Sequence, residues 1–184
     1  MNPLPRHLTA CAAAATALAL AACVQVGEVR ESHPAPAHSG PIAVRAEPCA
    51  DRTDTSGHDL GGQATKAFAE KLGAATEFKL EQDARYHLTC EVSGFAEGSA
   101  IKRWILPGWG ATIGRVTAML TDSKTGEILV IAEGNATVSA GGLYTIGAEE
   151  YIVPTAVDDV VTRLRAWARG EAVGESPGDG AIRR

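Results

Sequence analysis

The chain has 184 residues, with 17 Lys and Arg against 22 Asp and Glu, and a formal net charge of −5. This length suits one folded domain and is too short for a two-domain enzyme. The composition, 45% hydrophobic and 21% charged, is typical of a globular protein and excludes wholesale disorder. We expect no nucleic-acid partner, because nucleic acids bind basic surfaces that displace phosphate counterions.

The first residues have the pattern of an export signal. Arg6 precedes an uncharged apolar run at 8–22. This run is shorter than the roughly 20 residues of a membrane-spanning helix and ends in small residues, as cleaved signals do. The sequence therefore predicts a signal peptide at 1–22.

A lipoprotein motif ends this apolar run. Leu20-Ala21-Ala22-Cys23 matches the lipobox, after which cleavage leaves an N-terminal cysteine carrying diacylglycerol and further acyl chains such as palmitate. The motif predicts that Cys23 anchors the chain to a membrane without spanning it. A plain secretory signal with an incidental Cys23 is the alternative. Val24 replaces the Asp of inner-membrane retention signals, which favours the periplasmic face of the outer membrane.

The predicted mature chain divides into three regions by composition. Residues 23–41 include three prolines and predict a lipidated cysteine followed by a flexible tether. Residues 42–170 have continuous apolar periodicity and are long enough for one globular domain with a hydrophobic core. Residues 171–184 are rich in Gly, Pro and charge and predict a disordered tail.

Apolar periodicity within 42–170 predicts the secondary structure. We expect two amphipathic helices at 59–75 and 150–169, and strands at 42–46, 78–80, 85–95, 112–121 and 127–138. Residues 122–126 have the composition of a hairpin turn in which Gly126 adopts positive φ. The element order β-α-β-β-β-β-α predicts a two-layer α/β (α+β) domain. Its mixed or antiparallel sheet of about five strands carries both helices on one face.

Two short motifs resemble a known family. Arg103-Trp104-Ile105-Leu106-Pro107-Gly108-Trp109-Gly110, followed by a strand, Asp122 and Thr125-Gly126-Glu127, is similar to a proteobacterial lipoprotein family of unknown function. The resemblance covers residues 42–169. It implies a two-layer α/β body like those of small periplasmic assembly domains, and no particular activity.

No motif indicates catalytic residues, a cofactor or a metal. The glycine-rich segment 108–114 precedes a strand where a phosphate-binding loop needs a helix, so it is a connection between strands. The histidines of the mature chain, His33, His38, His58 and His87, lack ligand spacing toward carboxylates or thiols. Asp158 and Asp159 are expected to lie on the solvated face of the last helix.

Cys49 and Cys90 are the thiols that remain once 1–22 is removed and Cys23 is lipidated. An oxidising periplasm favours a disulfide bond between them. Two buried free thiols are the alternative. Pairing requires that the first strand and the strand at 85–95 be neighbours.

Residues 94–114 predict a long loop with basic and aromatic side chains, Lys102, Arg103, Trp104 and Trp109. Loops of this length are usually functional or disordered, and the apolar content argues against disorder. One interpretation is a partner-binding loop, because this composition is enriched at interface hot spots. In the other, the apolar residues form a buried strand edge and only Trp109 is exposed.

Together these features predict a lipid-anchored periplasmic protein that is not an enzyme and acts as a binding or assembly module. Its partners would be the membrane, through Cys23, and an envelope protein or polymer. The alternative function is an accessory hydrolase of envelope glycans, which would require two convergent carboxylates in a pocket.

Overall fold

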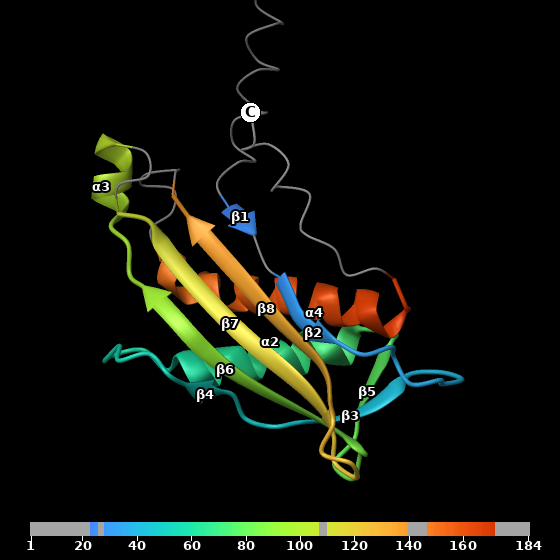
Figure 1. Ribbon diagram of the computed structural model, residues 1–184. Helices are drawn as coiled ribbons and strands as arrows, with labels where there is room; N and C mark the ends of the chain where they lie inside the picture. The colour runs from blue at the N-terminus through green and yellow to red at the C-terminus, as the bar shows by residue number, and fades with distance from the viewer. Residues whose placement is uncertain (1–22, 26–27, 107–109, 140–146, 172–184) are drawn as a thin grey trace, which may run out of the picture.

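A mixed β-sheet forms one layer of the computed structural model and two long helices form the other (Figure 1). The structure describes residues 23–25, 28–106, 110–139 and 147–171. The strands are β1 (Cys23–Gln25), β2 (Glu28–Ser32), β3 (Ile42–Ala46), β4 (Ala50–Asp51), β5 (Phe78–Leu80), β6 (Tyr86–Ala96), β7 (Thr112–Asp122) and β8 (Ile128–Val138). The helices are α2 (Leu60–Ala74), α3 (Ala100–Ile105) and α4 (Ala148–Ala168).

The sheet order is β1-β8-β7-β6-β3-β5, with β2 beside β8 and β4 beside β6. Strand β7 is antiparallel to both of its neighbours, β6 and β8, whereas β3, β4 and β5 run parallel to their neighbours. The series β3-α2-β5-β6-β7-β8-α4 has the predicted order β-α-β-β-β-β-α, and both long helices lie on one face of the sheet (Figure 1). The predicted fold class is confirmed.

Alternating burial explains the long strands. Along β7 every second side chain from Thr112 to Asp122 is buried, and the intervening ones face the open side of the sheet. The turn that follows has the expected positive φ at Gly126, 74°. Asp122 accepts hydrogen bonds within this turn from the Lys124 amide at 2.9 Å, and from Arg85 at the start of β6.

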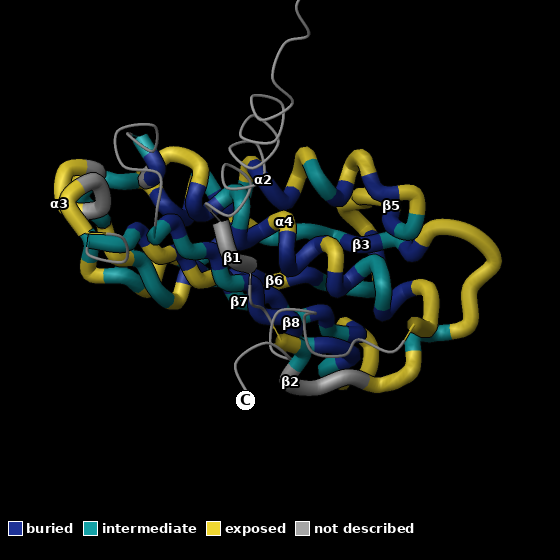
Figure 2. The backbone as a smooth tube through the Cα atoms, turned by 90° about the horizontal axis from the view of Figure 1, so that it is seen from above, coloured by how far each residue is buried: buried dark blue, intermediate teal, exposed yellow. Residues whose placement is uncertain are grey.

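The core lies between the sheet and the helices (Figure 2). α2 begins at its N-cap Asp59, whose carboxylate accepts the Gly62 amide at 2.8 Å. α4 packs close to β8 because Gly134 has no side chain. A Cβ atom there would lie 2.1 Å from the Ala156 carbonyl oxygen. The helix backbone therefore contacts the strand directly.

The prediction of a flexible tether over 23–41 is wrong for its first part. Cys23 pairs with Val138 and Glu28 with Glu133, so β1 and β2 extend the sheet along the free edge of β8. Val29 packs against the core. The backbone groups of β8 are satisfied by this pairing, and the prolines are confined to the segment after β2, at 33–41.

An ionic cluster fixes the C-terminal end of α4 to the start of β5. The carboxylate of Glu77 accepts hydrogen bonds from Arg165 at 2.9 Å and Arg169 at 2.5 Å. These guanidinium groups, Arg165 first, hold the pKa of Glu77 at about 2, although burial acts in the opposite direction.

Gly134→Ala should destabilise the domain by about 2–3 kcal/mol or more, because the added methyl group overlaps α4 backbone. Gly73→Ala is the matched control. Its Cβ would have no neighbour within 4 Å, and alanine should gain roughly 0.5–1 kcal/mol inside a helix. Urea unfolding measures both values. Equal stability of Gly134→Ala and the wild type would contradict the observed helix–strand contact.

Acid should weaken the domain through Glu77. Because its folded pKa is lowered, its stabilisation is present above about pH 4.5 and is lost as the pH falls toward about 2. Glu77→Gln should cost roughly 1–2 kcal/mol at neutral pH, since Arg165 and Arg169 are partly exposed. The loss should vanish near pH 2 in unfolding titrations. Glu70→Gln, an exposed α2 substitution, should show no such pH-dependent difference.

Candidate functional site

The segment between β6 and β7 forms a closed loop around the short helix α3. Ser99 caps this helix by accepting the Lys102 amide at 3.4 Å. Two hydrogen bonds close the base of the loop, from the Ser99 amide to the Gly110 carbonyl at 2.9 Å and from the Gly98 amide to Thr112 Oγ1 at 3.1 Å. Gly110 has φ 77°, and a Cβ atom there would lie 2.8 Å from the Cβ of Lys102.

Three large apolar side chains of this loop are exposed. Ile101 is 64% exposed, Ile105 61% and Leu106 59%. Ile101 and Ile105 are four residues apart and lie on one side of α3. Figure 2 shows α3 at the edge of the molecule, coloured largely as exposed. The interpretation of this segment as a buried strand edge is therefore wrong for these residues.

The structure describes only one of the four basic and aromatic side chains predicted for this loop. Lys102 is exposed on α3. Arg103 and Trp104 belong to the helix backbone, and their side chains lie outside what the structure describes, as does the whole of Trp109. The loop is also shorter than the predicted 94–114, because β6 extends to Ala96 and β7 begins at Thr112.

The register of the sheet places the predicted anchor at the same end as α3. Thr112, the first residue of β7, pairs with Val138 on β8, and Val138 pairs with Cys23 on β1. Figure 1 shows β1 and α3 at this end, and the 122–126 turn at the other. Sequence reasoning missed this proximity, because it treated the residues after Cys23 as a tether.

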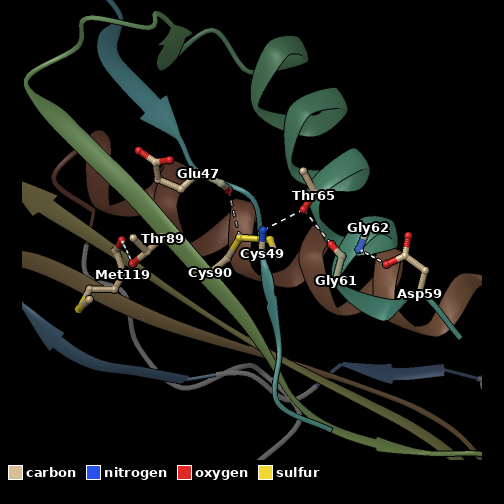
Figure 3. The surroundings of a disulfide bond; sticks show 9 residues. All are labelled: Glu47, Cys49, Asp59, Gly61, Gly62, Thr65, Thr89, Cys90 and Met119. Atoms are coloured by element: carbon tan, nitrogen blue, oxygen red, sulfur yellow. Dashed lines mark hydrogen bonds between the residues drawn. A yellow bond between two sulfur atoms is a disulfide. The ribbon is translucent and has the colours of Figure 1, made fainter. Parts of the chain in front are cut away.

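Cys49 and Cys90 are joined by a disulfide bond (Figure 3), as the preferred prediction proposed, with 4.6 Å between their Cα atoms. The adjoining residues Ala50 and Glu91 are paired between β4 and β6. The Cys49 amide donates to Thr65 Oγ1 at 2.8 Å. The bond therefore fastens the connection after β3 to the centre of the sheet, beneath α2.

The described residues contain no group of three or more His, Cys, Asp or Glu arranged to hold a metal. His33 lies 3.7 Å from Glu127, and His58 lies 3.8 Å from Glu97. Each of these contacts joins one histidine to one carboxylate, and the two lie on different parts of the surface.

The two acidic residues of α4 have different environments. Asp158 is exposed and pairs with Lys71 of α2 at 2.7 Å. Asp159 is buried and pairs with Arg163 at 3.2 Å, so the expected solvated position is wrong for Asp159. Burial raises its pKa, and Arg163 opposes the increase. The two carboxylates thus have separate partners and do not form an acid–base pair.

Among the described residues, no helix combines the length and apolar character needed to cross a bilayer. A groove of about 620 Å³ lies where residues 33–38 pass the C-terminal end of α4, lined by Trp167, Arg169 and Glu171 among others. Smaller hollows of about 330 and 310 Å³ lie along the α2–α4 contact. The carboxylates that line this contact include Glu70, which contributes to both hollows.

Comparison with known proteins identifies the fold. No family model and no curated protein matches the chain. Two structures of the PelC dodecamer from Paraburkholderia phytofirmans are similar. One, a variant, has 24% identity and a TM-score of 0.50, covering 79% of this chain and 98% of that chain. The other has 23% identity and a TM-score of 0.51, and the match covers 76% of this chain and 96% of the PelC chain. A Caulobacter crescentus protein described as a lipoprotein has 16% identity, a TM-score of 0.42 and coverage of 70% and 92%.

The chain is therefore a mixed α+β domain with the fold of PelC. Proteins described as lipoproteins are among the structures similar to it. The finer resemblance, to one proteobacterial lipoprotein family of unknown function, is not matched by any family model.

Removing the disulfide should lower stability without changing the fold. The double variant Cys49→Ala/Cys90→Ala should lose up to about 4 kcal/mol on the chain-entropy model, because the bond closes a loop with a sequence separation of 41 residues. Urea unfolding with and without reductant measures the loss. Reductant should weaken the wild type and leave the double variant unchanged. Labelling of Cys49 and Cys90 by a thiol reagent in the unfolded, unreduced wild type would contradict the bond.

Proposed function

We propose that this chain is a lipid-anchored protein of the cell envelope that acts by binding and assembly and is not an enzyme. The exposed side of α3, with Ile101, Ile105 and the following Leu106, is its docking surface and faces the membrane. The observation that supports this most directly is the pairing of Cys23 with Val138, at the end of the sheet where α3 also lies.

A lipid on Cys23 would leave no spacer between the bilayer and the folded body. β1 begins at Cys23 itself, so the acyl chains attach to a residue that is part of the sheet. This end of the sheet then lies against the headgroups, and α3 with it. Val24 favours the periplasmic face of the outer membrane.

The composition of α3 suits a lipid surface. The exposed Ile101, Ile105 and Leu106 would each gain roughly 1.5–3 kcal/mol on full transfer out of water. Lys102 and Arg103, which follow Ile101 in the sequence, are of the residue type that is attracted to anionic lipid, although the chain as a whole is acidic. Trp104 and Trp109 are residues of the type enriched at membrane interfaces.

Assembly of several copies is the second part of this proposal. The similar PelC fold occurs as a dodecamer, which supports a role for this chain as a subunit of an envelope assembly that could bind an envelope protein or polymer. The alternative is a glycan hydrolase, and the adjacent carboxylates Asp158 and Asp159 do not favour it, since they pair with different cations.

The test uses soluble Cys23→Ser protein and its flotation with vesicles of phosphatidylethanolamine and phosphatidylglycerol. We expect weak binding that falls at least about tenfold when Ile101, Ile105 and Leu106 are all replaced by Ser. Leu80→Ser is the control, since Leu80 is an exposed apolar residue on β5, toward the opposite end of the sheet. Equal loss in both variants, or none, would contradict a membrane-facing loop.

The anchor has its own measurement. Expressed in a Gram-negative host, the wild type should sediment with the membranes and carry acyl chains on Cys23 by mass spectrometry, whereas Cys23→Ser should be released. An unmodified Cys23 in the membrane fraction would refute the anchor, even if α3 still binds vesicles.

A further inference from the structure

The segment at 33–38, here called the strap, connects β2 to β3 and lies across the C-terminal end of α4. The His33 amide donates to the Leu129 carbonyl at 2.7 Å. The Trp167 indole N–H donates to the His33 carbonyl at 2.6 Å. At its other end, the strap meets α4 through His38, and the groove of about 620 Å³ lies between these two points.

Both ring nitrogens of His38 face carbonyl oxygens. Nδ1 lies 2.5 Å from the Gly40 oxygen and Nε2 lies 3.3 Å from the Ala168 oxygen. A carbonyl oxygen only accepts hydrogen bonds, so both contacts require an N–H on the ring. Neutral imidazole has a single N–H, whereas imidazolium has two. The cation alone can therefore make both bonds, whichever tautomer the neutral ring adopts.

We propose that His38 is a pH-dependent clasp, which in its protonated form fastens the strap to the end of α4 and in its neutral form releases one of the two bonds. The Ala168 carbonyl belongs to the last residue of α4. Such terminal carbonyls lack partners within the helix and attract cations through the helix dipole. Both properties make this carbonyl oxygen a suitable acceptor for an imidazolium N–H.

The other charged groups around the strap are paired with one another. Arg169 pairs with Glu77 and Glu171, which raises its pKa. Arg165 first, and Arg169 with it, lower the pKa of Glu77 to about 2, and Arg169 lowers the pKa of Glu171. His33, 3.7 Å from Glu127, is the other titrating group of the strap, so an experiment must separate it from His38.

Release of the clasp would affect the strand that carries the predicted anchor. The strap directly follows β2, and β1 and β2 are held along the edge of β8. A fastened strap therefore limits fraying of these edge strands from their C-terminal end. The proposal goes beyond the function proposed above and does not depend on lipidation.

The test follows the indole N–H of Trp167 in the soluble Cys23→Ser chain, because this proton reports whether the strap is docked. NMR hydrogen exchange, corrected for the intrinsic effect of pH, gives its protection at about pH 5.5 and pH 8, on either side of the usual histidine range. Protection should fall about threefold to tenfold at the higher pH, the change expected for one modest hydrogen bond.

His38→Gln should abolish this pH dependence, because glutamine does not titrate. His33→Gln should retain it, and His87→Gln on β6 is the control for removal of a distant histidine. Equal pH dependence in the wild type and His38→Gln would overturn the clasp. Loss of the dependence in His33→Gln alone would also overturn it, by assigning the effect to the His33–Glu127 contact.

Discussion

The arrangement of this molecule depends on one run of antiparallel backbone pairing, between the N-terminal segment and β8. A central strand such as β8 has hydrogen-bonding groups on both sides, and those facing away from β7 need partners. β1 and β2 supply them. β1 and β2 thereby replace β8 at this edge of the sheet, and short edge strands are poor sites for association with other chains. Because the register is fixed, the position of Cys23 relative to the sheet is fixed as well.

Most of the fold could be predicted from the sequence, because buried residues recur every second position in the strands and every three or four positions in the helices. Alternation along β6 and β7, and helical spacing along α2 and α4, gave the order of the elements and placed their ends within about two residues. One face of each segment packs against the core, so apolar residues recur at the spacing of the strand or helix. The pairing of Cys49 with Cys90 depended on two segments being neighbours, and the position of β4 beside β6 supplies that contact.

The remaining features could not be predicted, because they depend on partners distant in sequence. β1 and β2 are short and only Val29 is known to pack on the core, so their pattern is weak and the nearby prolines suggested a tether. The sequence indicates a surface position for Asp159, because it does not show that Asp159 is buried together with its partner Arg163. α3 has six residues, which is too few for helical periodicity to distinguish it from an edge strand. The exposure of its apolar residues could therefore not be predicted from the sequence.

The two ends of the sheet differ in a way that bears on orientation. At one end, Cys23 lies two strands from the base of a loop with exposed Ile101 and Ile105. At the other, the 122–126 turn is held by the Arg85–Asp122 ion pair, and Arg85 keeps the pKa of Asp122 at about 2. A long tether would let either end approach a bilayer. If Cys23 carries the proposed anchor, its place in β1 brings the end of the sheet that bears α3 toward the membrane, so the register of this edge strand would set the orientation of the domain.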